Sequence, residues 1–143
     1  ESQGYVHRLV GDLLRYKGNE QDAQKVFREG LEQFPGHLFL VDGLSASLMI
    51  TENWEQLQEL LETTLEQSQR LEGNPPIQLI FLDRLAVTYE RLQKTEKKLQ
   101  ILREYHQNND PLTAAQLNSL EEQLLFPVSL PSLEKALSPI LLP

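Results

Sequence analysis

The chain offers few side chains that could do chemistry. Its histidines are His7, His37 and His106, and none has a second histidine or a carboxylate at the spacing that a helical metal site needs. It has no cysteine, which excludes thiolate nucleophiles, disulfides and cysteine-based zinc sites. Serine stands in no nucleophile-elbow pattern, and the glycines form no phosphate-binding loop. We therefore expect no enzyme, no metal and no cofactor, with the histidines on the surface or at helix ends.

Carboxylates are abundant and gather at Glu20 to Asp22, from Glu52 to Glu62 and at Glu121-Glu122. The loop spacing and the glycine of a calcium-binding hand are absent. Carboxylates near a helix N-terminus interact favourably with the helix dipole. We therefore expect these clusters to be solvated helix faces and helix starts, not cation sites.

Composition restricts the class of protein and the class of partner. A chain of 143 residues with 40% hydrophobic content can form one domain or a short stack of repeats. The formal net charge of -8 works against binding the phosphates of a nucleic acid. No run approaches the roughly 18 apolar residues of a membrane span, and the first residues lack a signal-peptide pattern. We expect a soluble protein without a membrane span; the cytoplasm is favoured, although the lack of cysteine leaves the compartment open.

The apolar spacing at the start of the chain predicts two helices joined by a tight turn. Apolar residues recur at three-and-four spacing from Tyr5 to Tyr16, which is typical of an amphipathic helix. Gly18 tolerates the left-handed backbone that ends a helix, and Asn19 can cap the next one. The second helix is expected from Glu20 to Gln33, because Phe34-Pro35-Gly36 would stop it.

Two further helix pairs are predicted downstream. The second pair is expected from Leu38, with a turn at Thr51 to Asn53 and a helix from Trp54 to Leu71, and Trp54 should pack between units. Gly73 to Pro76 would break that helix and insert several residues before the third pair. The third pair is expected at 77–92 and 96–107, and Pro111 would end it because proline removes an amide donor.

Seven residues of the first pair fall at the spacings of a known repeat: Gly11, Leu14, Gly18, Ala23, Phe27, Gly30 and Pro35. This stretch resembles one tetratricopeptide repeat, a helix-turn-helix unit of about 34 residues in which small residues let two helices cross closely. The second unit is degenerate, since the matching places hold Ser45, Leu57, Leu61 and Thr64, whereas Leu85, Ala86 and Tyr89 of the third match again. The resemblance covers Gly4 to Leu112. It implies an all-α fold, a right-handed superhelical stack of about three helix pairs with a C-terminal capping helix.

In tetratricopeptide stacks the first helices of successive units line a concave groove that receives an extended or helical peptide. The positions that the resemblance carries over are Tyr5, Arg8, Asp12, Arg15, Tyr16, Phe39, Asp42, Ala46, Met49, Ile50, Ile80, Asp83, Val87, Glu90 and Arg91. Such a groove is apolar in the middle and charged at its ends, which suits a peptide with hydrophobic anchors. The alternative is that Phe39, Met49 and Ile50 are covered by neighbouring helices or by the C-terminal segment.

Some members of the family grip a C-terminal carboxylate with paired basic and asparagine side chains. The matching places in this chain hold Arg8, Asp12, Gly43, Ile80 and Arg84. The asparagines are absent, so we do not expect this chain to be a carboxylate clamp.

The last part of the chain differs in composition. We expect a helical repeat domain over residues 1–125, whose last helix between Leu112 and Leu124 caps the stack, and an apolar tail over residues 126–143 that four prolines interrupt. So much apolar surface should be covered. The tail could fold back, fill its own groove, dock into a second copy or bind another protein.

The function that follows is a non-catalytic protein-protein interaction module, a scaffold or adaptor that binds a partner peptide or helix in the groove. Two alternatives stay open. The chain could be an all-α regulatory or subunit domain of a larger enzyme or complex, or it could form homo-oligomers through its apolar tail.

Overall fold

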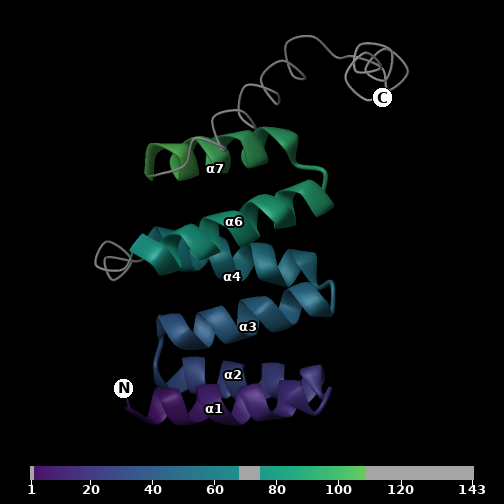
Figure 1. Ribbon diagram of the computed structural model, residues 1–143, viewed down its shortest axis with the longest axis vertical. Coiled ribbons are helices and arrows are strands. Elements are labelled where there is room, and N and C mark those ends of the chain that lie inside the picture. The colour runs from purple at the N-terminus through teal and green to yellow at the C-terminus, as the bar shows by residue number, and fades with distance from the viewer. Residues whose placement is uncertain (1, 68–74, 109–143) are drawn as a thin grey trace, which may run out of the picture.

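The computed structural model describes residues 2–67 and 75–108, and all the elements in these residues are α-helices (Figure 1). They are α1 (Ser2–Tyr16), α2 (Glu20–Gln33), α3 (Leu38–Ile50), α4 (Trp54–Gln67), α6 (Pro75–Arg91) and α7 (Thr95–Asn108). The predicted all-α class is therefore confirmed. The expected capping helix at 112–124, the tail at 126–143 and the extension of α4 to Leu71 lie outside the described residues.

The helices stack in chain order from α1 at one end to α7 at the other (Figure 1). Each helix packs against the next one along the chain, and α3 also contacts α1 and α6. Because α3 contacts helices on both sides of it, four of its apolar residues are buried: Leu40, Val41, Leu44 and Leu48. The core of the described residues therefore runs along the stack and is not confined to one pair.

The three tight turns between paired helices have the same geometry. Gly18, Glu52 and Gln93 all have positive φ, at 80°, 58° and 58°. At the first turn the Asn19 amide donates to Leu14 O at 2.8 Å and the Gly18 amide to Arg15 O at 2.9 Å, which is the Schellman pattern of a helix C-terminus. The same two bonds recur around Glu52 and Gln93. Glu52 follows Gly18 by 34 positions and Gln93 follows Glu52 by 41, so these turns fix which residues of α1, α3 and α6 are equivalent.

One aromatic ring joins the first three helices. Phe27 of α2 is fully buried and lies against two glycines, Gly11 of α1 and Gly43 of α3. A Cβ atom added at Gly11 would lie 2.2 Å from Phe27 Cε1, and one added at Gly43 would lie 2.9 Å from it. Gly30 likewise leaves room for Leu40 Cδ1. The prediction that small residues allow the close crossing is confirmed.

The apolar residues of α1 are not buried as an amphipathic helix would bury them. Val6, Leu9, Val10 and Leu13 are 59%, 61%, 41% and 54% exposed. Within this helix the buried positions are Gly4 and Gly11, and Leu14 packs against the core. The reason is steric: α1 turns its glycine side toward α2, because only there can the helices approach around Phe27.

Several helix boundaries differ from the prediction: the third pair occupies 75–91 and 95–108, not 77–92 and 96–107, and α1 begins at Ser2. Helix α6 begins at Pro75 and not at Ile77, because proline is tolerated in the first turn of a helix, where the missing amide has no partner. Helix α7 begins at Thr95, one residue earlier than expected. Trp54 packs against the core, as expected.

We predict that Gly11→Ala destabilises the chain although alanine is the better helix former. At an open helical site the exchange would stabilise by about 1 kcal/mol, whereas the clash with Phe27 should reverse the sign and cost about 1–3 kcal/mol. Urea unfolding measures the difference. Phe27→Leu should lessen the cost of Gly11→Ala, and equal costs in both backgrounds would contradict the steric account.

Candidate interaction surface

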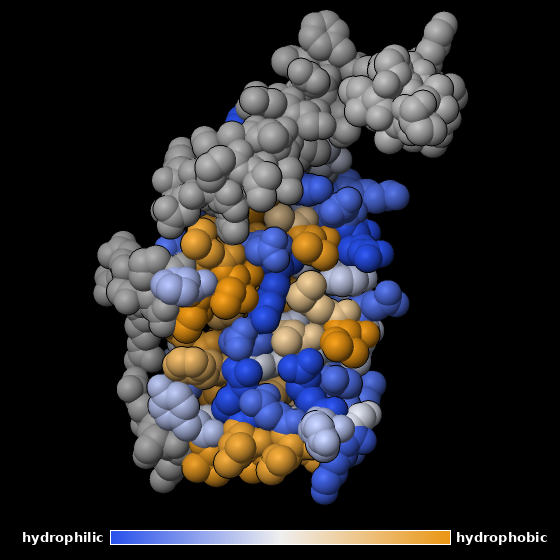
Figure 2. Space-filling model, viewed as in Figure 1, coloured by the Kyte–Doolittle hydropathy of each residue, from blue (hydrophilic) through white to orange (hydrophobic). Residues whose placement is uncertain are grey.

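The predicted groove positions occur at equivalent places on α1, α3 and α6. Figure 2 looks onto the side of the stack that these helices form; a stripe of hydrophilic residues runs up its middle, with apolar residues on both sides. The stripe contains ion pairs, its two sides carry exposed apolar side chains, and the reverse side of the stack has a groove.

The hydrophilic stripe contains a network of ion pairs across α1, α3 and α6, which we call the arginine network: Arg8, Asp12, Asp42, Ser45 and Arg84. Arg8 Nε lies 2.9 Å from Asp12 Oδ2, and Arg8 Nη1 donates to Asp42 Oδ2 at 2.8 Å and to Phe39 O at 2.6 Å. Arg84 Nη1 donates to Asp42 Oδ1 at 2.6 Å and to Ser45 Oγ at 2.6 Å. Asp42 thus joins an arginine from α1 to an arginine from α6.

The network balances its own charge with two arginines and two aspartates. Burial alone would lower the pKa of Arg8, but hydrogen bonds from its guanidinium to Asp42 and Asp12 outweigh this effect and raise the pKa above its usual value. The guanidinium therefore stays charged at any physiological pH. Three of the predicted groove residues, Arg8, Asp12 and Asp42, lie in contact, but they neutralise one another and hold helices in place.

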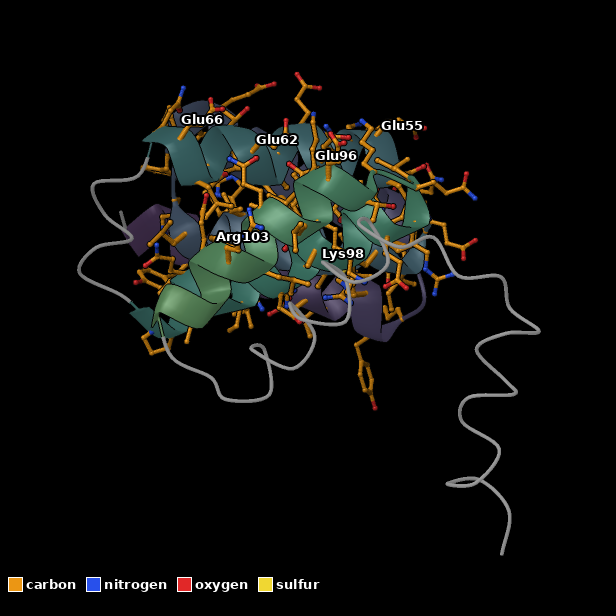
Figure 3. All side chains as sticks on the ribbon, turned by 90° about the horizontal axis from the view of Figure 1, so that it is seen from above. Glu55, Glu62, Glu66, Glu96, Lys98 and Arg103 are labelled. Atoms are coloured by element: carbon orange, nitrogen blue, oxygen red, sulfur yellow. The ribbon has the colours of Figure 1, made fainter. Side chains whose placement is uncertain are left out.

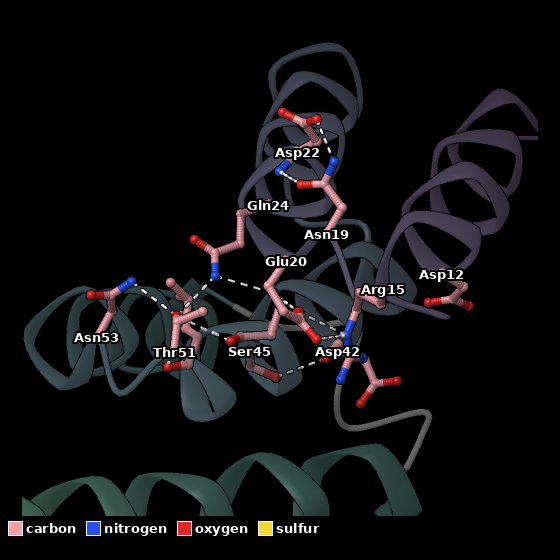
Figure 4. Close-up of polar contacts among 12 residues, drawn as sticks. Asp12, Arg15, Asn19, Glu20, Asp22, Gln24, Asp42, Ser45, Thr51 and Asn53 are labelled. Carbon is pink, nitrogen blue, oxygen red and sulfur yellow. Dashed lines mark hydrogen bonds and ion pairs between the residues drawn. The ribbon is translucent and has the colours of Figure 1, made fainter. Parts of the chain in front are cut away.

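A second polar cluster fixes the other end of α1 (Figure 4). Arg15 Nε lies 3.1 Å from Glu20 Oε2, and Ser47 Oγ donates to the same carboxylate. Gln24 Nε2 donates to Ser47 Oγ at 3.1 Å and to Thr51 Oγ1 at 2.9 Å. Arg15, a predicted groove residue, is thereby bound to the start of α2.

An aromatic cluster lies where α1 and α3 begin. The ring of Tyr5 meets the ring of His37 edge-on at 5.0 Å and the ring of Phe39 at 5.4 Å. Tyr5 and Phe39 are both about half exposed, whereas His37 is buried at the start of α3. His37 was expected on the surface or at a helix end; it lies at a helix end but is buried. Ile80, exposed on α6, occupies the equivalent position to Tyr5 and Phe39.

The opposite side of the stripe is also apolar. Tyr16 is 91% exposed and Ile50, at the equivalent position of α3, is 63% exposed. Ala46, Met49 and Val87 are half-buried, and Met49 packs against the core. The third unit contributes charge here, since Glu90 pairs with Lys98 at 3.2 Å and the Arg91 guanidinium lies 5.7 Å from the centre of the Trp54 ring. Asp83 is exposed.

A groove that no sequence pattern predicts lies on the reverse side, between α2 and α4. It has a volume of about 790 Å³ and an apolar floor that includes Leu31, Leu38 and Leu60. At its rim Arg28 Nη2 donates to Gln56 Oε1 at 2.8 Å. Leucines at helical spacing predict a core, but Leu31, Leu38 and Leu60 are only partly buried. No pattern in the sequence distinguishes a fully buried leucine from one that lines this groove.

Further along the stack, α4, α6 and α7 meet around Tyr89. Its hydroxyl donates to Glu62, and Lys97 Nζ lies 3.9 Å from the same carboxylate and 5.9 Å from the centre of the Tyr89 ring. Figure 3 looks down onto α7 and shows Glu62 and Glu66 on the adjacent α4. Glu62 was expected on a solvated face, but it is half-buried beside Tyr89 of α6 and Lys97 of α7. Burial of Tyr89, followed by its hydrogen bond to Glu62, raises the pKa of the phenol.

Within the described part of the chain, no three histidine or acidic side chains are grouped as a metal site would require. No helix there is both long and apolar enough to cross a membrane. A scan against models of protein families found no match, and a search of curated proteins found no significant one.

We predict that Asp42→Ala costs about 1–3 kcal/mol of stability, because it leaves two partly buried arginines without their shared carboxylate. The matched control is Asp83→Ala, which removes an exposed carboxylate at the equivalent position of α6 and should change stability by less than about 0.5 kcal/mol. Urea unfolding measures both. Equal costs would show that the network does not hold the helices together.

We predict that Tyr89 makes the chain less stable in alkali. Its pKa is raised in the folded state, whereas in the unfolded chain it is about 10. Stability is therefore fully present below about pH 10 and falls above it, as the unfolded state releases a proton that the folded state retains. Tyr89→Phe should flatten this fall above about pH 10. The free energy of unfolding of both proteins is measured in denaturant across this pH range. If it fell equally in both, Tyr89 would not be the cause of the fall.

Proposed function

We propose that this chain is a non-catalytic protein-interaction module, a scaffold or adaptor, whose helix pairs form a short right-handed superhelix of the tetratricopeptide kind. Its partner is a protein segment with apolar anchors, bound on the side formed by α1, α3 and α6. The repeated turns at Gly18, Glu52 and Gln93 support the repeat architecture. So does Phe27, which fills the space left by Gly11 of the preceding helix.

The observation that carries the proposal is the exposure of apolar side chains at equivalent positions of successive helices. Tyr5, Phe39 and Ile80 form one exposed row, and Tyr16 and Ile50 form the start of another. Side chains of this kind, partly exposed around a polar centre, are the usual anchors of protein interfaces. Since the arginine network lies between the rows and is neutral, the rows supply most of the affinity.

The geometry restricts the partner segment. Tyr5 and Tyr16 are 11 positions apart on one helix, which is about 16 Å at 1.5 Å per residue. A segment that contacts both rows must therefore place its apolar anchors about 16 Å apart, three turns of a helix or about five residues of a strand. A free carboxylate is not the expected ligand, because Arg8 and Arg84 already bind carboxylates of this chain.

The test uses Tyr16→Ala together with Ile50→Ala in the full chain. A partner is first identified by pulldown, and its affinity is then measured for the wild type and for this double variant. We expect affinity to fall at least fivefold, because both side chains are exposed and free to make contacts, while the urea midpoint stays unchanged. Met49→Ala is a poorer probe, because Met49 also packs against the core.

The matched control is Arg28→Ala, at the rim of the groove on the reverse side. It should leave affinity unchanged if the partner lies on α1, α3 and α6. Loss of binding with Arg28→Ala and full binding by the double variant would place the partner between α2 and α4 and refute the proposal.

A further inference from the structure

The outer face of α1 is an exposed apolar surface that the proposed function does not use. It consists of Val6, Leu9, Val10 and Leu13, which are one and two turns apart on α1 and all more than two-fifths exposed. Figure 2 shows it as an apolar band along the α1 end of the stack. None of its four side chains is charged or polar. A continuous apolar stripe of this kind marks a surface that another element covers.

The equivalent positions of the other first helices show what covers such a face. Those positions are Leu40, Gly43, Leu44 and Ser47 on α3, and Phe81, Arg84, Leu85 and Thr88 on α6. Seven of these residues are buried, and Arg84 is in the arginine network. On α3 the cover is α2: Gly30 lies against Leu40, Phe27 against Gly43, and Gln24 donates to Ser47. On α6 the helix packed alongside is α4. Both covers are the second helix of the preceding pair.

We propose that the outer face of α1 seats an amphipathic helix, the second helix of a further helix-turn-helix unit, in the way that α3 seats α2. The α1 face repeats the α3 face, but with larger and more apolar residues at two positions. The occupant is therefore not a copy of α2, and its chemistry can be stated position by position.

Leu13 stands where Ser47 binds Glu20 and Gln24. A helix seated over Leu13 should be apolar at the places of those two residues, because leucine can neither donate to a carboxylate nor accept from an amide as Ser47 does. Leu9 stands where Gly43 leaves room for Phe27. The residue at the place of Phe27 must therefore be smaller than phenylalanine. Leu61 of α4 occupies the position equivalent to Phe27 in the next unit, where Arg84 stands at the position equivalent to Gly43.

The size of the face favours one helix over a second copy of the chain. Val6 to Leu13 spans about 10 Å of helix, the contact length of a single crossing helix. Two α1 helices paired face to face would bury only this stripe on each partner. A stable dimer needs about 800 Å² per partner, which four partly exposed aliphatic side chains do not supply.

The experiment duplicates residues 4–37 within the full chain, so that the copy precedes Gly4. The α1 helices of copy and original are then 34 positions apart, as α1 and α3 are. The copy carries Glu20→Leu, Gln24→Leu and Phe27→Leu. Because the chain has no cysteine, a single Leu9→Cys reports on the face through its rate of reaction with a maleimide.

In the chain without the duplication, we expect the cysteine of Leu9→Cys to react at the rate of an exposed thiol. In the duplicated chain the same cysteine in the second α1 should react at least tenfold more slowly. A cysteine placed at Leu9 of the first α1 serves as the internal control, because no helix pair has been added before that helix, and it should keep the fast rate.

Three results would overturn the proposal. Equal rates at both positions would mean that the face does not accept such a helix. Protection in the chain without duplication that grows with protein concentration would make a second copy the occupant, and protection independent of concentration would mean that the chain covers its own face. If the duplicated chain does not fold, a helical peptide of residues 19–34 with the same three changes, added at about 1 mM, must slow the reaction; no slowing rejects the proposal.

Discussion

The ring of Phe27 between two glycines is the contact on which the N-terminal half of the structure depends. It sets how closely α2 approaches α1 at Gly11 and α3 at Gly43. That approach places α1 beside α3, and only then can Arg8 reach both Phe39 O and Asp42. It also turns Val6 and Leu9 away from the core. One steric requirement thus decides which residues of α1 are structural and which remain available for other contacts.

The charged residues of the α1, α3 and α6 side serve mostly to connect helices. Asp42 links α1 to α6 through two arginines, and Glu20 links the end of α1 to α3. Surface ion pairs contribute little one by one, but a partly buried network with shared partners restricts how the helices are oriented. What this leaves for recognition is apolar: two rows of exposed side chains on either side of a neutral stripe. The proposed partner is therefore selected by the spacing of its anchors more than by its charge.

Equivalent positions of the successive helix interfaces hold different residues. Phe27 packs against Gly43, whereas the equivalent positions of the next interface are Leu61 and Arg84. The longer spacing of 41 positions between the second and third turns does not change the turn itself, because the added residues lie before it: α6 is longer than α3, and the connection from α4 to α6 is longer than that from α2 to α3. The irregularity of the repeats thus lies in side-chain packing and in one connection. The side chains at each interface decide which residues can pack against them, and the side chains on the outer face of α1 do the same for a helix that packs there.

The sequence by itself determined the helices, the three turns and the close crossing at Gly11 and Phe27, because these depend on local propensity and on spacing within about 34 residues. It also predicted which positions of α1, α3 and α6 are equivalent, because the helix-turn pattern recurs along the chain. It did not determine which of them would be free: Arg8, Asp12, Asp42 and Arg15 are held by partners that only the packing of distant helices provides. Nor could it separate the covered leucines from the exposed ones, because apolar residues surround much of α1 and the burial of each depends on whether another helix lies within contact distance of it.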